Sequence, residues 1–397
     1  MSHLLEHAHA GGLEEIVAIR HQIHAHPELG FEENQTSALV ANSLKSWGIE
    51  VTEGVGRLGV VGSIKGRIPG DRHIGLRADM DALALNETND LPYASQHPGK
   101  MHACGHDGHT AMLLGAARLL ARDRNFSGTV HVIFQPAEEG LGGAQAMLAD
   151  NLFGRFPCER VYGMHSYPPL PTGHFGTRVG PLMAASGRWQ VEFSGTGGHG
   201  GMSPHLATDL TLVQAGFIQS LQSLVAREVP PHETAIVSVG YLNAGAPTAM
   251  NVMPSKLQVS GTMRAFQGEV QTLLETRIRQ LAEAHAALVG ASAKTKLWWN
   301  TVPVDNHAKA VEIALNSARK VVDASQVHAN HEPVTAGEDF AYMMRERPGA
   351  FMFLGNGPEG SHTGGGNLHM PNYDFNDHAL PYGIAYWLAL VEEELAP

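Results

Sequence analysis

Hydrophobic positions in the first part of the chain recur at helical spacing and then in short runs typical of strands. Ile16, Ile19 and Ile23 share one face of a helix predicted over 13–26, which ends before Pro27. The pattern continues as a helix (33–47), a glycine-punctuated hairpin (55–65), a buried strand (74–78), a helix (110–121), a strand (130–135), a helix (143–149) and a strand (161–165). Strands that alternate with helices predict a layered α/β sheet with parallel strands at its centre.

The middle of the chain has a different order of elements. The pattern predicts a strand (188–193), a long helix (206–226), two strands (235–242 and 256–265), a helix (269–288) and a last strand (294–299). This β-α-β-β-α-β order is that of a ferredoxin-like α+β unit.

The α/β pattern returns near the end of the chain, with helices (308–322 and 338–345), a strand (350–354) and a terminal helix from about residue 377. We therefore expect two domains. A discontinuous α/β domain of residues 1–183 and 299–397 has a central, largely parallel sheet, and an inserted ferredoxin-like domain occupies residues 184–298.

Composition and charge narrow the class of protein. The chain has 397 residues and a formal net charge of −12, which argues against nucleic acid or an anionic membrane as the main partner. No apolar run approaches the roughly 20 residues that span a bilayer, and the first residues lack the pattern of a signal peptide. Cys104 and Cys158 are too few for a disulfide framework. We expect a cytoplasmic protein.

Reactive side chains follow three of the predicted strands. Asp79 and Asp81 follow the strand at 74–78, Glu138 and Glu139 follow the strand at 130–135, and His165 ends the strand at 161–165. Ligands of open α/β sheets bind outside the carboxyl ends of the strands. The pattern therefore indicates a ligand-binding or catalytic site rather than side chains that only pack in the core.

The densest cluster of such residues is the run His102–His109. Cys104 and His106 are held by glycines and can face one point, where a thiolate and an imidazole bind zinc, manganese, cobalt or nickel. A lone cysteine here is as often a buried structural residue. The adjacent Glu138 and Glu139 can divide two roles, one binding metal and the other polarising water, although an acidic pair at a helix start is the common alternative.

The remaining histidines give weaker signals. The loop histidine His369, between glycines and Pro371, is by itself more often a surface residue than a ligand. We expect His3, His7 and His9 to lie in a polar tail. We expect structural or solvent-facing positions for His21, His24 and His26. His102 and His109 are expected beside a metal rather than as its ligands.

Several of these residues lie in motifs that closely resemble one known family. The motifs are HQIHAHPELGFEE (21–33), RADMDAL (77–83), MHACGHDGHTAMLLGAA (101–117), FQPAEEG (134–140), GMH (163–165) and LHMPNYDFND (368–377). They resemble the metal-dependent aminoacylase and carboxypeptidase family, in the branch of hippurate hydrolase, N-acetyl-amino-acid deacetylases and indole-acetyl-amino-acid hydrolases. The likeness covers nearly the whole chain, including the inserted domain.

The resemblance implies a site for two divalent metal ions in the larger domain. It implies that Glu138 is the general base and that Asp81 orients a ligand histidine. The implied metal ligands are Cys104, His106, Glu139, His165 and His369.

The inserted domain would then act as a lid and as a dimerisation domain. The resemblance implies that His199 donates to the oxyanion, that Asn251 contacts the substrate and that Arg264 holds its carboxylate. It also implies a homodimer or homotetramer. The chain departs from the family pattern at Ala84, where proline is frequent, and in the loop 201–204, and both departures bear on substrate preference.

The expected activity is hydrolysis of the amide bond of N-acyl amino acids. Three alternatives stay open at this stage. One is dipeptidase or carboxypeptidase activity at the same site. Another is a cysteine-nucleophile hydrolase that uses Cys104 with His106 or His109 and needs no metal. The third is a non-catalytic metal- or ligand-binding protein on the same scaffold.

Overall fold

A computed structural model describes residues 2–357 and 366–396, which fall into two compact units. Unit 1 comprises Met1–Leu182, Val304–Glu332 and Asp339–Pro397, and unit 2 comprises Met183–Pro303 and Pro333–Glu338. The short second segment of unit 2 is additional to the inserted range expected from the sequence. It belongs to this unit because the Ala184 amide donates to Val334 O at 3.1 Å and Arg264 Nε donates to Thr335 O at 2.9 Å.

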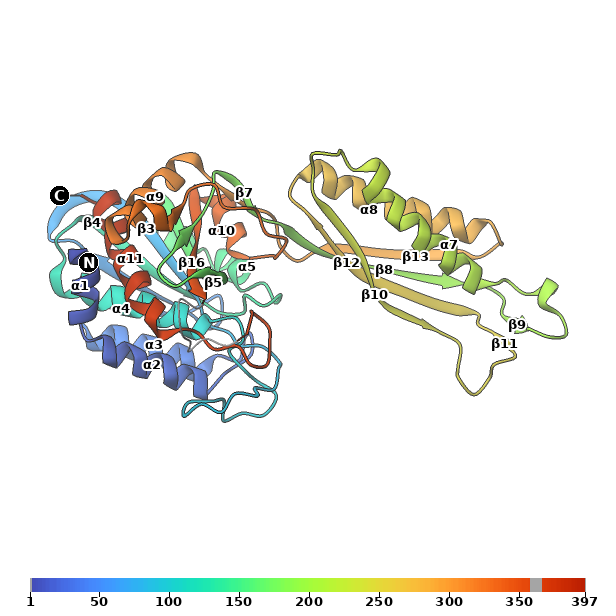
Figure 1. Ribbon diagram of the computed structural model, residues 1–397, viewed down its shortest axis with the longest axis horizontal. Coiled ribbons are helices and arrows are strands. Elements are labelled where there is room, and N and C mark those ends of the chain that lie inside the picture. The colour runs from blue at the N-terminus through green and yellow to red at the C-terminus, as the bar shows by residue number, and fades with distance from the viewer. Residues whose placement is uncertain (1, 358–365, 397) are drawn as a thin grey trace. The chain divides into compact units, whose positions relative to one another are not determined.

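Unit 1 is built on an eight-stranded sheet with the order β1-β2-β4-β3-β5-β16-β6-β15. Figure 1 labels its central strands β3, β4, β5 and β16. Its central strands β4, β3, β5 and β16 run parallel, whereas β1 and β2 pair antiparallel at one edge. This confirms the predicted layered α/β sheet. The strands are β1 (Glu50–Val55), β2 (Gly59–Lys65), β3 (Ile68–Asp79), β4 (Ser127–Gln135), β5 (Arg160–Pro171), β6 (Phe175–Gly176), β15 (Val327–His328) and β16 (Gly349–Gly357).

Two groups of helices surround this sheet, some in contact with its strands and others packed on neighbouring helices. The first group is α1 (His3–Ala10), α2 (Leu13–Ala25), α3 (Asn34–Ser46), α4 (His106–Asp123), α9 (Ala308–Val321) and α11 (Leu380–Glu394). The second group is α5 (Gly143–Ala149), α6 (Leu152–Arg155) and α10 (Phe340–Glu346). Helix α4 is buried along most of its length, because it packs on β3 and also lies against α2 and α11. The elements that carry the predicted site therefore belong to the core of unit 1.

Unit 2 is an antiparallel four-stranded sheet with the order β10-β12-β8-β13. Its α7 and α8 lie side by side against the sheet (Figure 1). Every second residue of β8 is buried, which is typical of a sheet covered on one face only. This order confirms the ferredoxin-like arrangement. The elements are β8 (Ala185–Ser194), α7 (Leu210–Ser223), β10 (Ala235–Ala244), β12 (Lys256–Ala265), α8 (Gly268–Ala287) and β13 (Ser292–Trp299).

Short elements complete the two units. A two-stranded ribbon of unit 2 joins β9 (Gly198–His199) to β11 (Val252–Met253). The others are β7 (Gly180–Met183) with β14 (Val304–Asn306), the 3-10 helices η1 (Pro204–Leu206), η3 (Ala324–Gln326) and η4 (Asp377–Ala379), and the π-helix η2 (Leu224–Glu228). None of the helices in the described part of the chain has the length and apolar character needed to cross a bilayer.

Several sequence predictions differ from the structure, and three of these differences have a clear physical reason. The expected polar tail is the helix α1, whose Leu4 and Leu5 are buried and whose N-terminus is capped by Ser2. The first strand of the hairpin begins at Glu50 rather than at 55, because β1 is a half-exposed edge strand with mixed polarity. Helix α4 begins at His106 rather than at 110, because its first turn is buried by polar contacts and so has no apolar periodicity.

Candidate metal centre

Five chain segments bring the predicted site residues of unit 1 together. Strand β3 ends at Asp79, and Asp81 follows it; Glu138 and Glu139 follow β4; His165 lies within β5. Helix α4 begins at His106, two residues after Cys104, and His369 lies on the loop before α11. The amide of His369 donates to Ala103 O at 2.7 Å, which ties that loop to the cysteine segment.

Gly105 allows the cysteine segment to turn into α4. It is the N-cap residue of the helix and has φ 86°, a left-handed conformation that favours glycine. A Cβ atom at this position would lie 2.6 Å from Ser166 Oγ and 2.6 Å from Tyr373 Oη. Both the backbone and the packing therefore require glycine between Cys104 and His106.

Potential metal-ligand atoms meet in two overlapping groups. Cys104, His106 and His165 form one group and Cys104, Glu139 and His369 form the other, with all ligand atoms in each group within 4.8 Å of one another. Cys104 Sγ lies 3.4 Å from His165 Nε2 and 3.3 Å from His369 Nε2. All five candidate ligands are thus adjacent, and Cys104 is common to both groups.

The ring orientations direct Nε2 of two histidines toward this cluster. His165 Nδ1 donates to Ser166 O at 2.7 Å, and His106 Nδ1 lies 3.3 Å from Asp81 Oδ1. The Nε2 atom of His106 is buried and has no hydrogen-bond partner among the described residues. A buried imidazole nitrogen without a partner costs free energy, which a bound cation would remove. The donors, one thiol, three imidazoles and one carboxylate, fit a borderline divalent metal.

Asp81 connects two of the candidate ligands. Its Oδ2 accepts a hydrogen bond from the Glu139 amide at 2.9 Å, while its Oδ1 faces His106. Glu138 lies in a third group of close donor atoms with His106 and Glu139. The amide of Asp339 donates to Glu138 Oε1 at 3.2 Å. Glu138 is therefore held beside the cluster by a contact of its own.

Asp79 and His109 form a support for the cluster; a place beside the metal was expected for His109, whereas Asp79 had no assigned role. His109 Nε2 accepts from the Ser166 amide at 2.8 Å, so Nδ1 must carry the proton that is donated to Asp79 Oδ1 at 2.7 Å. Burial lowers the pKa of His109 and keeps it neutral. Arg77 Nη1 donates to Asp79 Oδ2 at 2.7 Å. The sequence feature that pointed to Asp79 as a site residue was its position at the end of a predicted strand.

Burial and charge set the protonation of the ligand candidates. Burial, with the nearby Glu139 charge, raises the pKa of the Cys104 thiol. Hydrogen bonds to Cys104 and Glu139 raise the pKa of His369 to about 10. Although burial opposes ionisation of Glu139, hydrogen bonding to His369 lowers its pKa. A divalent metal cation would displace the protons held by the thiol and the imidazoles, because these groups bind metal only when they are deprotonated.

A buried charge network adjoins the first turn of α4. Asp107 Oδ2 lies 2.8 Å from His24 Nδ1 and 3.2 Å from Arg20 Nη1, and His24 Nε2 lies 3.2 Å from Glu87 Oε1. Burial alone would lower the pKa of His24, but these carboxylates raise it to about 9. His24, for which the sequence left a solvent-facing position open, is fully buried. His102 is also buried, and burial lowers its pKa to about 4.

The three remaining predicted residues lie in unit 2. His199 and Asn251 are neighbours, because the Gly200 amide donates to Asn251 O at 2.8 Å and Val252 pairs with His199. His199 Nδ1 accepts from the Gly201 amide at 3.2 Å and the Met202 amide at 3.0 Å, which leaves Nε2–H as the free donor of the neutral ring.

Arg264 lies on β12 of the same unit. Its Nε donates to Thr335 O at 2.9 Å and its Nη1 donates to Met263 O at 3.0 Å. Burial and the charge of Arg188 lower its pKa. Two arginines that repel one another create a local positive potential, which favours an anionic ligand.

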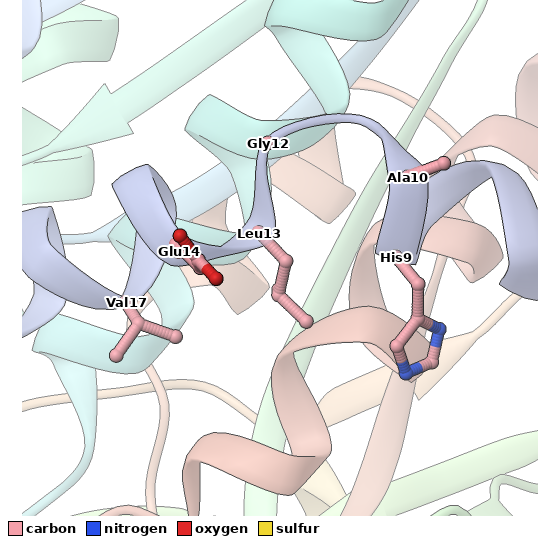
Figure 2. A pocket seen from close by; sticks show the side chains of 6 residues that line it. All are labelled: His9, Ala10, Gly12, Leu13, Glu14 and Val17. Atoms are coloured by element: carbon pink, nitrogen blue, oxygen red, sulfur yellow. The ribbon is translucent and has the colours of Figure 1, made fainter.

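A surface hollow lies elsewhere in unit 1, at the turn between α1 and α2 (Figure 2). It is lined by His9, Ala10, Gly12, Leu13, Glu14 and Val17. Figure 2 shows only one carboxylate and one imidazole there, and they do not point at each other. The hollow contains none of the predicted site residues and has no convergent chemistry.

Known proteins resemble the chain over nearly its full length. It is 41% identical over 378 residues to the hippurate hydrolase of Campylobacter jejuni, covering 95% of each chain. It is 37% identical to the N-acetylcysteine deacetylase of Bacillus subtilis, covering 94% of this chain and 95% of the relative. The crystal structure of the Bacillus subtilis YXEP protein, described as a dinuclear metal binding peptidase from the M20 family, matches with a TM-score of 0.81 and 33% identity over 96% of this chain and 97% of that one.

The sequence profile of one family covers the regions that carry the site of unit 1. Residues 75–393 match it, and this range includes the end of β3, α4, β4, β5 and the His369 loop. The match confirms the resemblance found in the motifs: the chain belongs to peptidase family M20/M25/M40.

Proposed function

We propose that the protein is a metal-dependent amidohydrolase that cleaves N-acyl amino acids into a carboxylic acid and a free amino acid. The observation that carries this proposal is the convergence of Cys104, His106, Glu139, His165 and His369 beside the second carboxylate, Glu138. The family relatives named for hippurate hydrolysis and N-acetylcysteine deacetylation support the substrate class.

The five convergent side chains would hold two divalent ions, and Cys104 belongs to both ligand groups. Bound there, the ions would supply Lewis-acid polarisation of the scissile carbonyl and lower the pKa of water. The donor set suits zinc, manganese, cobalt or nickel. Asp81 holds His106 and the Glu139 amide, so that both ligands keep their orientation.

Glu138 is the proposed general base. Its carboxylate takes a proton from the attacking water and transfers it to the departing amine nitrogen, which leaves as a neutral amine. The hydrogen bond from the Asp339 amide to Glu138 Oε1 holds this carboxylate beside the ligand cluster, where it can exchange that proton. The adjacent carboxylate, Glu139, would hold metal, so the two neighbouring glutamates would not compete for one role.

Unit 2 would supply the groups that recognise the substrate. The Nε2–H of His199 is the donor for the oxyanion, and the neighbouring Asn251 contacts the substrate. Arg264 pairs with the free α-carboxylate of the amino acid. We further propose that this unit acts as a lid and joins two or four copies of the chain, in a cytoplasmic enzyme whose two cysteines are unpaired.

The cysteine-nucleophile alternative is disfavoured by the environment of the thiol. A nucleophilic cysteine needs a lowered pKa and access to solvent. Burial raises the pKa of Cys104, and the whole residue is only 8% exposed. His109, one of its two suggested partners beside His106, has both ring nitrogens engaged with Asp79 and Ser166.

A substrate panel tests the proposal and separates it from peptidase activity. Free amino acid is measured after incubation of the metal-loaded protein with N-acetyl, N-benzoyl and longer N-acyl amino acids, with unblocked dipeptides as the comparison. We expect turnover of the N-acyl amino acids. Turnover of dipeptides alone would move the assignment to a dipeptidase.

A further inference from the structure

One segment of the sequence motifs has no role in the chemistry proposed above. It is His26–Glu33, which connects α2 to α3. Its Glu28 O accepts a hydrogen bond from the Ala82 amide at 2.8 Å, next to the loop of Asp81. Its Gly30 packs on Ala137, so that a Cβ atom on Gly30 would lie 3.1 Å from Ala137 Cα. The segment therefore lies against both loops that carry the carboxylates.

Glu33 makes the most direct of these contacts. Its side chain is fully buried, and Oε1 accepts a hydrogen bond from the Ala137 amide at 2.7 Å. Ala137 has φ 53°, a left-handed conformation that is unfavourable for a residue with a Cβ atom. The next residue is Glu138. Without Glu33 this amide would be buried without an acceptor, in a backbone conformation that nothing else at its N–H stabilises.

Other contacts restrain the loop on both sides of this amide. The Ala137 carbonyl accepts from the Gly143 amide at 3.0 Å, and the Glu139 amide donates to Asp81 Oδ2. A Cβ atom at Gly143 would lie 1.6 Å from Pro136 O, so the loop closes tightly on itself. The direction in which the Glu138 side chain leaves the backbone depends on the Ala137 conformation between these fixed points.

We propose that Glu33 is a positioning residue for the general base: it holds the Ala137 amide and thereby fixes the left-handed turn from which the Glu138 side chain projects. The inference rests on the proposed function. It assigns to the HPELGFEE motif a role in catalysis that acts through Glu138, without contact to the substrate or the metal ions.

The hydrogen bond from the Ala137 amide needs an acceptor oxygen at hydrogen-bonding distance, and it does not need that oxygen to be negatively charged. Burial, together with the charge of Asp81, raises the pKa of Glu33 to about 7. A glutamine amide oxygen can accept the same hydrogen bond from Ala137. An aspartate keeps the charge, but its shorter side chain withdraws the oxygen from the amide.

Two conservative variants separate these properties in the full-length, metal-loaded protein. Glu33→Asp should lower kcat by about 10- to 100-fold, as expected when a catalytic group is displaced by an ångström or less, with KM and metal content unchanged. Glu33→Gln should keep kcat close to the wild-type value. Steady-state kinetics on an N-acyl amino acid, elemental analysis and Tm are measured on the same preparations.

Two further variants exclude a merely structural role. Glu28, in the same segment, accepts hydrogen bonds from the Gln35 and Thr36 amides at the start of α3. Glu28→Ala should therefore lower Tm without lowering kcat. Ala137→Gly added to Glu33→Asp should restore much of the lost kcat, because glycine adopts the left-handed turn without cost.

The outcomes are distinct. Wild-type kcat in Glu33→Asp, an inactive Glu33→Gln beside an active Glu33→Asp, or an equal loss of kcat in Glu28→Ala would each overturn the positioning role. If the wild-type protein hydrolyses no N-acyl amino acid, the proposed function itself fails. If the wild type is active and Glu33→Asp equals it, only the role of Glu33 fails.

Discussion

Asp81 Oδ2 accepts a hydrogen bond from the Glu139 amide at 2.9 Å. The other oxygen of the same carboxylate lies 3.3 Å from His106 Nδ1. One buried side chain thus orients a histidine from the start of α4 and a glutamate from the loop after β4. Because ligands fixed before binding lose less entropy when the ion arrives, this arrangement favours tight metal binding.

Cys104→Ala should lower the metal content, since it removes the side chain common to both ligand groups. Cys158→Ala is the matched control: Cys158 is also buried and unpaired, but its Sγ donates to Phe156 O and belongs to neither ligand group. Elemental analysis after desalting compares the two variants. Equal metal content in both would remove Cys104 from the ligand set.

Arg264→Lys should harm the hydrolysis of N-acyl amino acids much more than that of the matching amides, whose carboxylate is blocked. Lysine keeps the charge but loses the two-pronged geometry of the guanidinium group. The control is Arg188→Lys, at the neighbouring arginine of the same sheet, which pairs with Thr262. The ratio of kcat/KM for acid and amide substrates is the measurement, and an unchanged ratio would give Arg264 a structural role.

Replacement of His24 should destabilise the protein more at low pH than at high pH. In the folded protein the pKa of His24 is raised to about 9, whereas the unfolded value is about 6.5. The contribution of ionised His24 to the free energy of unfolding is therefore complete below about pH 6.5 and is lost as the pH rises through about 9. We expect His24→Asn to cost about 1–3 kcal/mol near neutral pH, the usual penalty for unpaired buried groups.

Urea unfolding of the wild type and of His24→Asn, at a pH near 6 and at one above 9, checks the sign of this effect. His26→Asn is the control, because His26 lies two residues further along and contacts His97 rather than a carboxylate. A difference in unfolding free energy that grows with pH would show that His24 is neutral in the folded state.

His199 should act in the active site of a partner subunit. Mixing Glu138→Ala chains with His199→Ala chains, followed by subunit exchange, places both intact residues at one site of each mixed dimer. About half of the dimers are mixed, so about a quarter of the wild-type activity should return. No recovery, with exchange confirmed by native mass spectrometry, would place His199 in its own chain's site.

The sequence predicted the strands and the residues at their ends better than it predicted the polar interior. Helix α5 and strand β12 have the predicted bounds, because apolar spacing alone determines them. The first turn of α4 was missed because Asp107 and His109 are buried through hydrogen bonds, which leave no apolar period in the sequence.

The contacts that orient the site residues could not be predicted from the sequence for the same reason. Asp339 follows Glu138 by 201 positions, and no local pattern indicates that its amide meets the Glu138 carboxylate. Likewise, the acceptor of the Ala137 amide is Glu33, which is 104 positions away. Spacing identifies candidate ligands within one segment, whereas the groups that hold them come from elements that only the folded sheet brings together.

The most direct test of the account is the turnover of Glu138→Gln measured together with its metal content. Glutamine nearly preserves the shape of the side chain but cannot accept the proton from water. The account predicts a loss of kcat on N-acyl amino acids of at least about 10²–10⁴-fold, with two metal ions per chain retained as in the wild type. Wild-type turnover in a fully metal-loaded Glu138→Gln protein would contradict it.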